Sequence, residues 1–456
     1  MIIGVLKEPS PETRVSILPE HLTTLKKWNV DAVVEINAGI SAFATNEKYT
    51  NAGAKVVSRE EVLQTADIIL SINIFSEAQT SDLKSKVLLG NYQALFNAAL
   101  IKGWSDKGIT VFSIDMIPRT TRAQSMDVLS SQANIAGYKA VLLAANLFPR
   151  YFPMFMTAAG SIPPAKVLIL GAGVAGLQAI ATARRLGAVV EVFDTRPAVK
   201  EEVMSLGAKF VEVEGAADAS KAGGYAVEQS EEFLQKQKAK IAKSVAKADI
   251  IITTAQIPGK KAPVLITTQM MENMKNGSVI IDLAAATGGN TELTKNAESF
   301  SHNGVTIVGN SNLPGTMPYD ASKLYGKNIL NFLQLIIDKE GRPDDPVGRG
   351  RCTGSCEQKE LPEEYNRRVN ECIEQLHKEL PTFALVDDGL SEEEQSCILM
   401  EKGRFYGMGY LPLHVSISGV DDLKNYITPY SENDYIRGLV YQHAVKFPHK
   451  KIALVN

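Results

Sequence analysis

The stretch KVLILGAGVAGLQAIATARRLGAVVEVFD, residues 166–194, decides the fold of the region around it. A short apolar run typical of a buried strand leads into Gly171, Gly173 and Gly176 in the spacing G-x-G-x-x-G. The first glycine allows a tight turn, the second lets a pyrophosphate approach the backbone, and the third lets helix and strand pack closely. A helix, a second strand and Asp194 follow in register. The stretch therefore predicts a dinucleotide-binding βαβ unit, in which Asp194 accepts hydrogen bonds from ribose hydroxyls and favours NAD over NADP.

Short strand-like runs alternate with helix-like segments on both sides of this stretch, from residue 1 to about residue 340. Such alternation is typical of parallel sheets with helices on both faces. We predict an α/β fold with two Rossmann-like, doubly wound parallel-sheet domains and a cleft between them. The N-terminal domain comprises residues 1–131 and is completed by residues 311–340, because the apolar helix SKLYGKNILNFLQLII is expected to return to the first sheet. The NAD-binding domain comprises residues 132–310.

The composition changes at about residue 341. The segment DKEGRPDDPVGRGRCTGSC is rich in glycine, proline and charge, which indicates a linker. We predict that residues 341–456 form a linker and an unrelated, small α+β module, with an amphipathic helix in LPEEYNRRVNECIEQLHKEL and strands in TFALVDDG and RFYGMGYLPL. All four cysteines lie in this part, and so few do not make a disulfide framework. They are Cys352, Cys356, Cys372 and Cys397.

The overall composition is that of an ordinary globular protein, with 45% hydrophobic residues, 22% charged residues and a formal net charge of −3. Nucleic-acid binding needs concentrated positive charge, so no nucleic acid is expected as a partner of residues 1–340. The sequence contains no run of about 18 apolar residues, and its start, MIIGVLKEPSPETR, does not resemble a signal peptide. We therefore expect a cytosolic protein, and we predict no metal site.

Histidine is scarce in the first 340 residues, where only His21 and His302 occur. A dehydrogenase that oxidises an alcohol or an amine needs a general acid or base, often a histidine. We expect His21 in an N-terminal helix and His302 in a surface turn, both solvated and not catalytic. Hydride transfer between two nicotinamide rings needs no such group, so the scarcity is compatible with a second nucleotide as substrate. Lys7 or Asp127 would still be available as a base.

The stretch RTTRAQSMD, residues 119–127, places two arginines, a glutamine and an aspartate between an expected strand and an expected long helix. This stretch resembles part of the NAD(H)-binding component, domain I, of the proton-translocating NAD(P) transhydrogenase alpha subunit. The resemblance extends over residues 1 to about 340. It rests on KEPSPETRVSILPEH, PRTTRAQSMDVLSSQANIAGYKAV, the glycine stretch quoted above, AGGYA, TTAQIPGKKAPVLIT, GSVIIDLAAATGGN and DASKLYGKNILNFL.

The resemblance implies roles for four residues at the nicotinamide end of an NAD site. Arg119 and Ser130 would hold the carboxamide region. Asp127 would orient Arg119, and Gln124 would bridge toward the partner that carries NADP. Arg119, Gln124 and Asp127 are accordingly the expected catalytic residues. The alternative is a helix cap with solvated charges, in which Ser125 or Asp127 serves the first turn.

The resemblance also assigns residues to the rest of the nucleotide. Thr195 and Arg196 join Asp194 at the adenosine ribose, although Arg196 weakens the preference for NAD that the aspartate implies. Gly224 and Tyr225 would lie in a mobile loop that closes over the nucleotide. The full set of expected cofactor-binding residues is Arg119, Gln124, Asp127, Ser130, Gly171, Gly173, Val174, Gly176, Asp194, Thr195, Arg196, Gly224, Tyr225, Gln237 and Gln256.

Partners and location follow from the same resemblance. It implies that this chain binds NAD(H), that a partner component binds NADP(H), and that a separate membrane-spanning component carries the proton path. It also implies a homodimer in the cytoplasm, peripheral to the inner membrane. The rival is an alanine dehydrogenase-like enzyme, which shares the architecture and an N-terminal KE…RV motif. Its substrate site uses a lysine and a histidine, but ADIILSINIF has Ser71 where the lysine is expected and LLGNYQALF has no histidine.

The tail from about residue 345 resembles a different family, the C-type subunit of the bacterial excision-repair nuclease and its relatives. The resemblance rests on GRCTGSCEQKELPEEYNRRVNECIEQL and on FALVDDG with SCILMEKGRFYGMGYLP. Cys352 and Cys356 match two of that family's four iron–sulfur cysteines, but Cys372 and Cys397 have the wrong spacing, so no cluster is predicted. A DNA-repair accessory or binding module is the function left open for the tail, which is either a genuine fusion or a join of two reading frames.

Overall fold

A computed structural model describes residues 1–75, 83, 85–213, 231–338, 341–342, 361–379, 381–391, 393–415, 419–430 and 434–454. The chain forms two compact units, Met1–Asp344 and Asp345–Asn456.

The first unit begins with a six-stranded sheet in the order β3-β2-β1-β4-β5-β6, in which every neighbouring pair is parallel. Its buried strands are β-branched and apolar on both faces, as parallel strands covered by helices require. The strands are β1 (Ile2–Val5), β2 (Asp31–Glu35), β3 (Lys55–Val57), β4 (Ile68–Leu70), β5 (Val87–Gly90) and β6 (Thr110–Ser113). The helices between them are α1 (Leu22–Lys27), α2 (Asn46–Asn51), α3 (Arg59–Thr65) and α4 (Ala98–Asp106).

A second sheet in the same unit has the order β11-β10-β9-β12-β13-β15-β14. All its pairs are parallel except β14 with β15, which is antiparallel. Its strands are β9 (Lys166–Leu170), β10 (Val189–Phe193), β11 (Lys209–Phe210), β12 (Ile250–Thr253), β13 (Val279–Asp282), β14 (Glu298–His302) and β15 (Val305–Gly309). The helices that cover it are α6 (Val174–Arg185), α7 (Lys200–Ser205), α8 (Glu231–Val245) and α9 (Thr268–Glu272).

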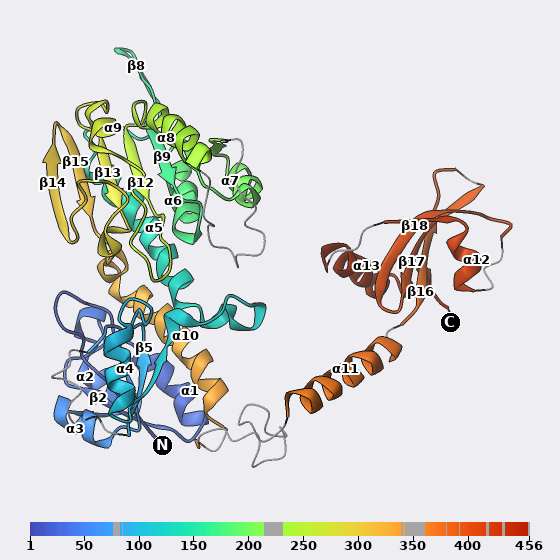
Figure 1. The fold of residues 1–456 in the computed structure, drawn as a ribbon, viewed down its shortest axis with the longest axis horizontal. Coiled ribbons are helices and arrows are strands. Elements are labelled where there is room, and N and C mark those ends of the chain that lie inside the picture. The colour runs from blue at the N-terminus through green and yellow to red at the C-terminus, as the bar shows by residue number, and fades with distance from the viewer. Residues whose placement is uncertain are drawn as a thin grey trace. The chain divides into compact units, whose positions relative to one another are not determined.

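Two long helices connect the sheets, as Figure 1 shows. The first is α5 (Val128–Leu147), whose first residue belongs to the core of the first sheet and whose later apolar residues belong to the core of the second. Gly137 lets it approach α6, because a Cβ there would lie 2.1 Å from the carbonyl oxygen of Ala175. The second is α10 (Pro318–Ile336), which packs into the core of the first sheet through Tyr325, Ile329 and Leu333.

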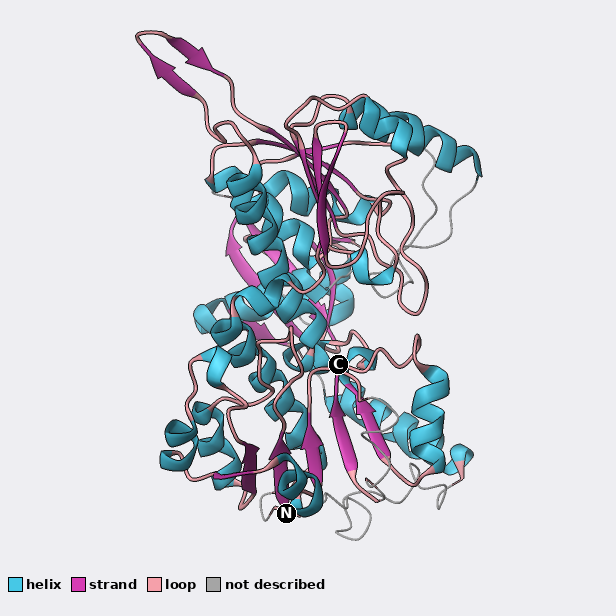
Figure 2. Cartoon of the chain, turned by 90° about the vertical axis from the view of Figure 1, so that its left-hand side faces the viewer, coloured by secondary structure: helices cyan, strands magenta, loops and turns pink. Residues whose placement is uncertain are grey.

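The prediction of two Rossmann-like parallel-sheet domains is therefore confirmed, and both sheets have the Rossmann strand order. Four strands were not expected. The short β3 completes the edge of the first sheet, and β14 adds a polar, antiparallel edge to the second. A hairpin of β7 (Phe155–Thr157) and β8 (Gly160–Ile162) projects from the body of this unit (Figure 2). His302 lies at the end of β14 and not in the surface turn that we predicted.

The second unit contains α11 (Pro362–Glu379) and a five-stranded antiparallel sheet in the order β19-β18-β17-β16-β20. The predicted amphipathic helix and two of these strands match α11, β16 (Phe383–Asp388) and β18 (Arg404–Pro412). Helix α12 (Val420–Lys424) contributes to the core on one side of the sheet, and α13 (Asp434–Lys446) to a separate core. The remaining strands are β17 (Glu394–Glu401), β19 (Ile427–Pro429) and β20 (Lys451–Ala453).

Candidate functional site

A cavity of about 930 Å³ lies between the two sheets of the first unit. Residues that follow strands β5, β6, β9, β10 and β12 line it, so it lies at the carboxyl ends of parallel strands. This is where open α/β sheets bind ligands, and the volume suits a large organic ligand such as a dinucleotide. The first sheet contributes Asn91, Gln93, Leu95, Phe96, Asp115, Met116 and Arg119 to the lining.

The glycine turn after β9 has the geometry that close contact with a pyrophosphate requires. Gly171 has φ +107°, which favours glycine, and its N–H donates to the carbonyl of Phe193 at 2.8 Å. A Cβ at Gly173 would meet nothing within 4 Å, so this glycine leaves space directly before the N-terminus of α6. A Cβ at Gly176 would lie 1.9 Å from the carbonyl oxygen of Gly171, so helix and strand pack too closely for any side chain there. The turn fits a dinucleotide pyrophosphate.

Asp194, at the end of β10, is held by an ion pair with Arg196. Arg196 Nη2 donates to Asp194 Oδ2 at 2.8 Å, and Arg196 Nε donates to Oδ1 at 2.9 Å. The side chains are 6% exposed for the aspartate and 18% for the arginine. The hydrogen bond to Asp194 raises the pKa of Arg196, against the effect of burial. The carboxylate also accepts from the N–H of Ala172 at 2.7 Å, which ties it to the glycine turn.

The stretch 119–127 forms a 3₁₀ helix, Thr121–Met126, between β6 and α5. Its backbone is anchored to α10, because Asn328 Nδ2 and Asn331 Nδ2 donate to the carbonyl oxygen of Ser125 at 2.7 and 2.8 Å. Asp127 is the N-cap of α5 and accepts from the N–H and the hydroxyl of Ser130 at 2.9 and 2.6 Å. The capping role considered from the sequence is thus present, and it orients Ser130 at the cavity.

The structure brings most of the expected cofactor-binding residues to one cavity. Gln237 is 6% exposed there and its Oε1 has no hydrogen-bond partner among the described residues. Gln124, Asp127 and Gly176 do not line the cavity, and Gln124 is exposed on the 3₁₀ helix. Gly224 and Tyr225 lie outside the described residues. The expected residues that line the cavity are Arg119, Ser130, Gly171, Gly173, Val174, Asp194, Thr195, Arg196, Gln237 and Gln256.

Apart from Gln256, the cavity residues that follow β5 and β12 were not predicted from the sequence. The loop after β12 carries Thr254 to Gly259 and is fixed by Asn290, which is fully buried. Asn290 Oδ1 accepts from the N–H of Ala255 at 3.0 Å, and its Nδ2 donates to the carbonyls of Ala255 and Pro263 at 2.8 Å. The carboxyl ends of the predicted strands were the signal that could have indicated these loops.

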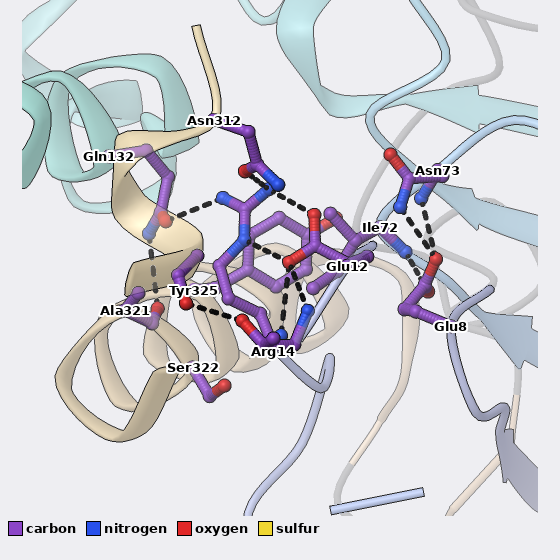
Figure 3. A network of polar contacts seen from close by, with 12 residues as sticks. Glu8, Glu12, Arg14, Ile72, Asn73, Gln132, Asn312, Ala321, Ser322 and Tyr325 are labelled. Atoms are coloured by element: carbon purple, nitrogen blue, oxygen red, sulfur yellow. Dashed lines mark hydrogen bonds and ion pairs between the residues drawn. The ribbon is translucent and has the colours of Figure 1, made fainter. Parts of the chain in front are cut away.

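A buried polar network lies beside the cavity, at the carboxyl ends of β1 and β4 (Figure 3). Arg14 donates to Glu12 through Nε at 2.8 Å and Nη2 at 2.7 Å, and to Gln132 Oε1 at 2.8 Å. Its Nη2 also donates to Asn312 Oδ1 at 3.3 Å. Burial opposes ionisation of Glu12, but the hydrogen bonds and charge of Arg14 hold the pKa of that carboxyl below its ordinary value. Arg14 thereby joins the N-terminal segment to α5 and to the segment before α10.

Glu8 belongs to the same region and has a different electrostatic state. It accepts from the N–H of Ile72 at 2.6 Å and from the N–H and Nδ2 of Asn73 at 3.1 and 2.9 Å. Burial raises its pKa in spite of these hydrogen bonds. Ser71, where the rival enzyme has a lysine, is hydrogen-bonded to the Tyr92 hydroxyl at 3.0 Å. None of these residues is in the cavity lining.

His21 is not solvated, so this part of the prediction is wrong. The side chain is 8% exposed and packs against Gly326 of α10. Its Nδ1 accepts from the N–H of Leu18 at 3.1 Å, and burial lowers the pKa of the imidazole. The short 3₁₀ turn that contains it, Pro19–His21, directs the ring under α10. The prediction failed because the residue type alone does not reveal such a tertiary contact. His21 does not line the cavity.

The second unit has ion pairs among its described charged groups. Arg367 contacts Glu371 at 2.8 Å on α11, and Asp387 contacts Lys450 and lies 3.7 Å from His443. Burial raises the pKa of the Cys397 thiol to about 12. Cys352 and Cys356 lie outside the described residues.

Comparisons with known proteins follow the boundaries of the first unit. Family models for the N-terminal and C-terminal domains of alanine dehydrogenase/PNT match residues 4–136 and 140–346. The first part of the NAD(P) transhydrogenase subunit alpha of Rhodospirillum rubrum is 47% identical over 367 residues, covering 77% of this chain and 96% of the relative. An alanine dehydrogenase of Staphylococcus epidermidis is 26% identical over 349 residues, covering 74% of this chain and 88% of the relative.

A solved transhydrogenase from Sinorhizobium meliloti shares 44% identity with a TM-score of 0.68, covering 74% of this chain and 93% of that one. Both family models end by residue 346. The resemblance of the tail to the excision-repair nuclease finds no support in these matches and stays a prediction. The chain belongs to the alanine dehydrogenase/PNT family, and within it to the NAD(P) transhydrogenase alpha subunits.

Proposed function

We propose that residues 1–344 are the NAD(H)-binding component of a proton-translocating NAD(P) transhydrogenase. In this function, hydride passes between NAD(H) in the cavity and NADP(H) on a partner component, and a separate membrane component moves the proton. The chain's own contribution is to hold and orient one nicotinamide. No described helix of this chain has the length and apolar character that crossing a membrane requires. A location in the cytoplasm, peripheral to the inner membrane, is part of the proposal.

One observation carries the proposal. Arg119 and Ser130 line the same cavity as the glycine turn and Asp194, although about forty residues or more separate the stretches in sequence. The turn suits the pyrophosphate, and Asp194 follows β10, where the adenosine ribose is expected. We assign the nicotinamide to the part of the cavity that Arg119 and Ser130 line. There, the guanidinium and the hydroxyl are suited to hold a carboxamide. NAD(H), when bound, supplies the hydride at C4 of its nicotinamide.

The chemistry of the lining also favours transfer between nucleotides over amino-acid oxidation. Among the described residues that line the cavity there is no histidine. Lys7 does not line it either, and Asp127 caps α5. Arg14 is a buried cation of the kind that binds a substrate carboxylate, but it is already paired with Glu12. The lining does contain other ionisable side chains, namely Asp115, Lys238 and Glu292. What the described part of the chain lacks is the particular pair expected of an alanine dehydrogenase-like enzyme, because Ser71 stands where its lysine is expected and no described lining residue is a histidine.

The deciding experiment mixes this chain with an NADP-binding component and supplies NADPH with an oxidised NAD analogue that absorbs at its own wavelength. Formation of the reduced analogue is the expected result. The control gives the chain NAD and alanine, for which we expect no NADH. Alanine-dependent NADH, without transfer to the analogue, would overturn the proposal.

A homodimer is the assembly we propose for this component. Four apolar side chains in and before the β7–β8 hairpin are exposed, with Met156 76% exposed. These four side chains are Tyr151, Met154, Phe155 and Met156. A projecting apolar hairpin is suited to contact a second copy of the chain. Met156→Glu should shift the chain from dimer to monomer in light scattering, whereas Met204→Glu, at an exposed site on α7, should leave the mass unchanged.

A further inference from the structure

The carboxylate of Asp194 has its hydrogen-bonding capacity filled by the protein. Oδ2 accepts from the N–H of Ala172 at 2.7 Å and from Arg196 Nη2 at 2.8 Å. Oδ1 accepts from the N–H of Arg196 at 2.8 Å and from Arg196 Nε at 2.9 Å. A carboxylate offers about four lone-pair sites. In this conformation Asp194 therefore has no acceptor left for a ribose.

Two of the four hydrogen bonds come from backbone N–H groups and two from the guanidinium. The backbone bonds belong to the glycine turn and to the turn after β10, so they stay whenever the fold is intact. The guanidinium bonds are lost by rotation of one side chain, and they occupy one site on each oxygen. Departure of the guanidinium thus frees two acceptor sites on Asp194, which matches the two hydroxyls of the adenosine ribose.

Arg196 lines the cavity, and its side chain is 18% exposed, so part of it is accessible to a ligand in the cavity. The charge of Glu202, in α7, contributes to the raised pKa of Arg196, which places a second carboxylate near the guanidinium. A guanidinium at this position also reduces the repulsion between Asp194 and the 2′-phosphate of NADP(H). It can donate two hydrogen bonds to that phosphate. The same side chain therefore influences how both kinds of nucleotide bind.

We infer that Arg196 is a specificity-determining gate at the ribose end of the cavity. Its guanidinium occupies two acceptor sites of the Asp194 carboxylate and leaves them when the ribose of NAD(H) binds. When NADP(H) binds, the guanidinium pairs with the 2′-phosphate. The inference rests on the proposed function, since it assumes that the adenosine ribose of a dinucleotide reaches Asp194. It makes Arg196 unfavourable for NAD(H) binding and favourable for NADP(H) binding.

The opposite role for Arg196 is a static one. If the guanidinium only held Asp194 in the orientation that the ribose needs, its removal would weaken NADH binding. The gate predicts a change of the opposite sign. The direction in which NADH affinity changes therefore separates the two roles. A general loss of packing would not strengthen NADH binding.

The test compares the full chain with its Arg196→Gln variant by titrating NADH and NADPH and following the fluorescence of the bound reduced nicotinamide. We expect NADH to bind about tenfold more tightly and NADPH about tenfold more weakly, each the effect of about one charge-assisted hydrogen bond. Lys209→Gln is the matched control, because Lys209 pairs with Glu191 at 3.5 Å on the same sheet but outside the cavity lining. It should change neither affinity.

Arg196→Lys is the second variant, which keeps the charge without the planar fork. We expect an NADH affinity between those of the parent chain and Arg196→Gln. Equal or weaker NADH binding by both variants, with an unchanged melting temperature, overturns the gate. Failure of the parent chain to bind either nucleotide overturns the proposed function instead. Continued hydride transfer by a variant that binds NADH more weakly overturns the gate and leaves the function standing.

Discussion

The six parallel strands of each sheet in the first unit follow the same order, but the two sheets differ at their switch points. In the second sheet the crevice after β9 is lined by glycines and lies on a cavity. In the first sheet the corresponding place, after β1 and β4, is filled by Glu8, Glu12 and Arg14, which hydrogen-bond to the protein itself. Strand order therefore offers a place for a ligand, whereas the residues at the strand ends decide whether that place is used.

The largest expected effect comes from breaking the filled site. Arg14→Met leaves Glu12, whose side chain is 5% exposed, without its cation. Removal of one partner of a buried pair costs about 3–5 kcal/mol, so the free energy of unfolding should fall by that amount in urea titrations. The double variant Arg14→Met with Glu12→Leu should recover most of the loss. A normal stability together with lost NADH binding would show that Arg14 serves a ligand and that the comparison is wrong.

A second prediction concerns the nicotinamide end of the cavity. Arg119→Ala should lower hydride transfer in the mixture with the NADP-binding component by about 100-fold, because misplacement of a reacting group is penalised far more in rate than in affinity. The dissociation constant for NADH should rise by less than about fivefold. Arg122→Ala is the control, since Arg122 is exposed on the 3₁₀ helix that begins two residues after Arg119 and does not line the cavity. Equal losses in the two variants would argue against the role of Arg119.

A third prediction separates two glycines of one turn. Gly173→Ala adds a methyl group that meets no protein atom within 4 Å, so the melting temperature should stay unchanged. NADH affinity should fall about tenfold, because the methyl group occupies the space expected for the pyrophosphate. Gly176→Ala meets the Gly171 carbonyl at 1.9 Å and should lower stability and affinity together. Identical behaviour of the two variants would show that the turn has no nucleotide-specific role.

The smallest effect is a pH dependence in the first domain. Burial lowers the pKa of His21 from its ordinary value of 6.5, so the unfolded chain binds a proton at a higher pH than the folded chain does. Stability should therefore fall as the pH drops below about 6.5 toward the lowered pKa, with a maximum slope of about 1.4 kcal/mol per pH unit. Urea titrations at pH 7.5 and 5.5 measure the difference. The difference should shrink in His21→Gln, and a stability that rises on acidification would contradict the lowered pKa.

Much of the fold could be predicted from the sequence, because buried parallel strands are continuous apolar runs. The segment of β9, α6 and β10 is the clearest case, since glycine spacing, helix and strand agree. Strand β14, with the sequence ESFSH, was missed because it is a polar edge strand that is stabilised by pairing with β15 and not by its own pattern. The hairpin β7–β8 was missed because none of its side chains contributes to a core.

The candidate site was predicted in part for a related reason. Local motifs indicate residues that touch the cavity from one segment, such as Asp194, but they do not show what those residues already contact. The guanidinium of Arg196 donates to both carboxylate oxygens of Asp194, and this pairing depends on the rotamers of the two side chains. Arg14 contacts Gln132 and Asn312 across 118 and 298 positions of sequence, a tertiary arrangement that no spacing rule contains.

The return of α10 to the first sheet has a consequence for synthesis of the chain. Residues 140–310 contain every strand of the second sheet, so its core can close before residue 318 leaves the ribosome. The core of the first sheet includes Tyr325, Leu333 and Ile337, which are made after the other parts of that core. The domain that is translated first is therefore the one that finishes folding second. Its apolar surface stays uncovered by α10 while about two hundred residues are added to the chain.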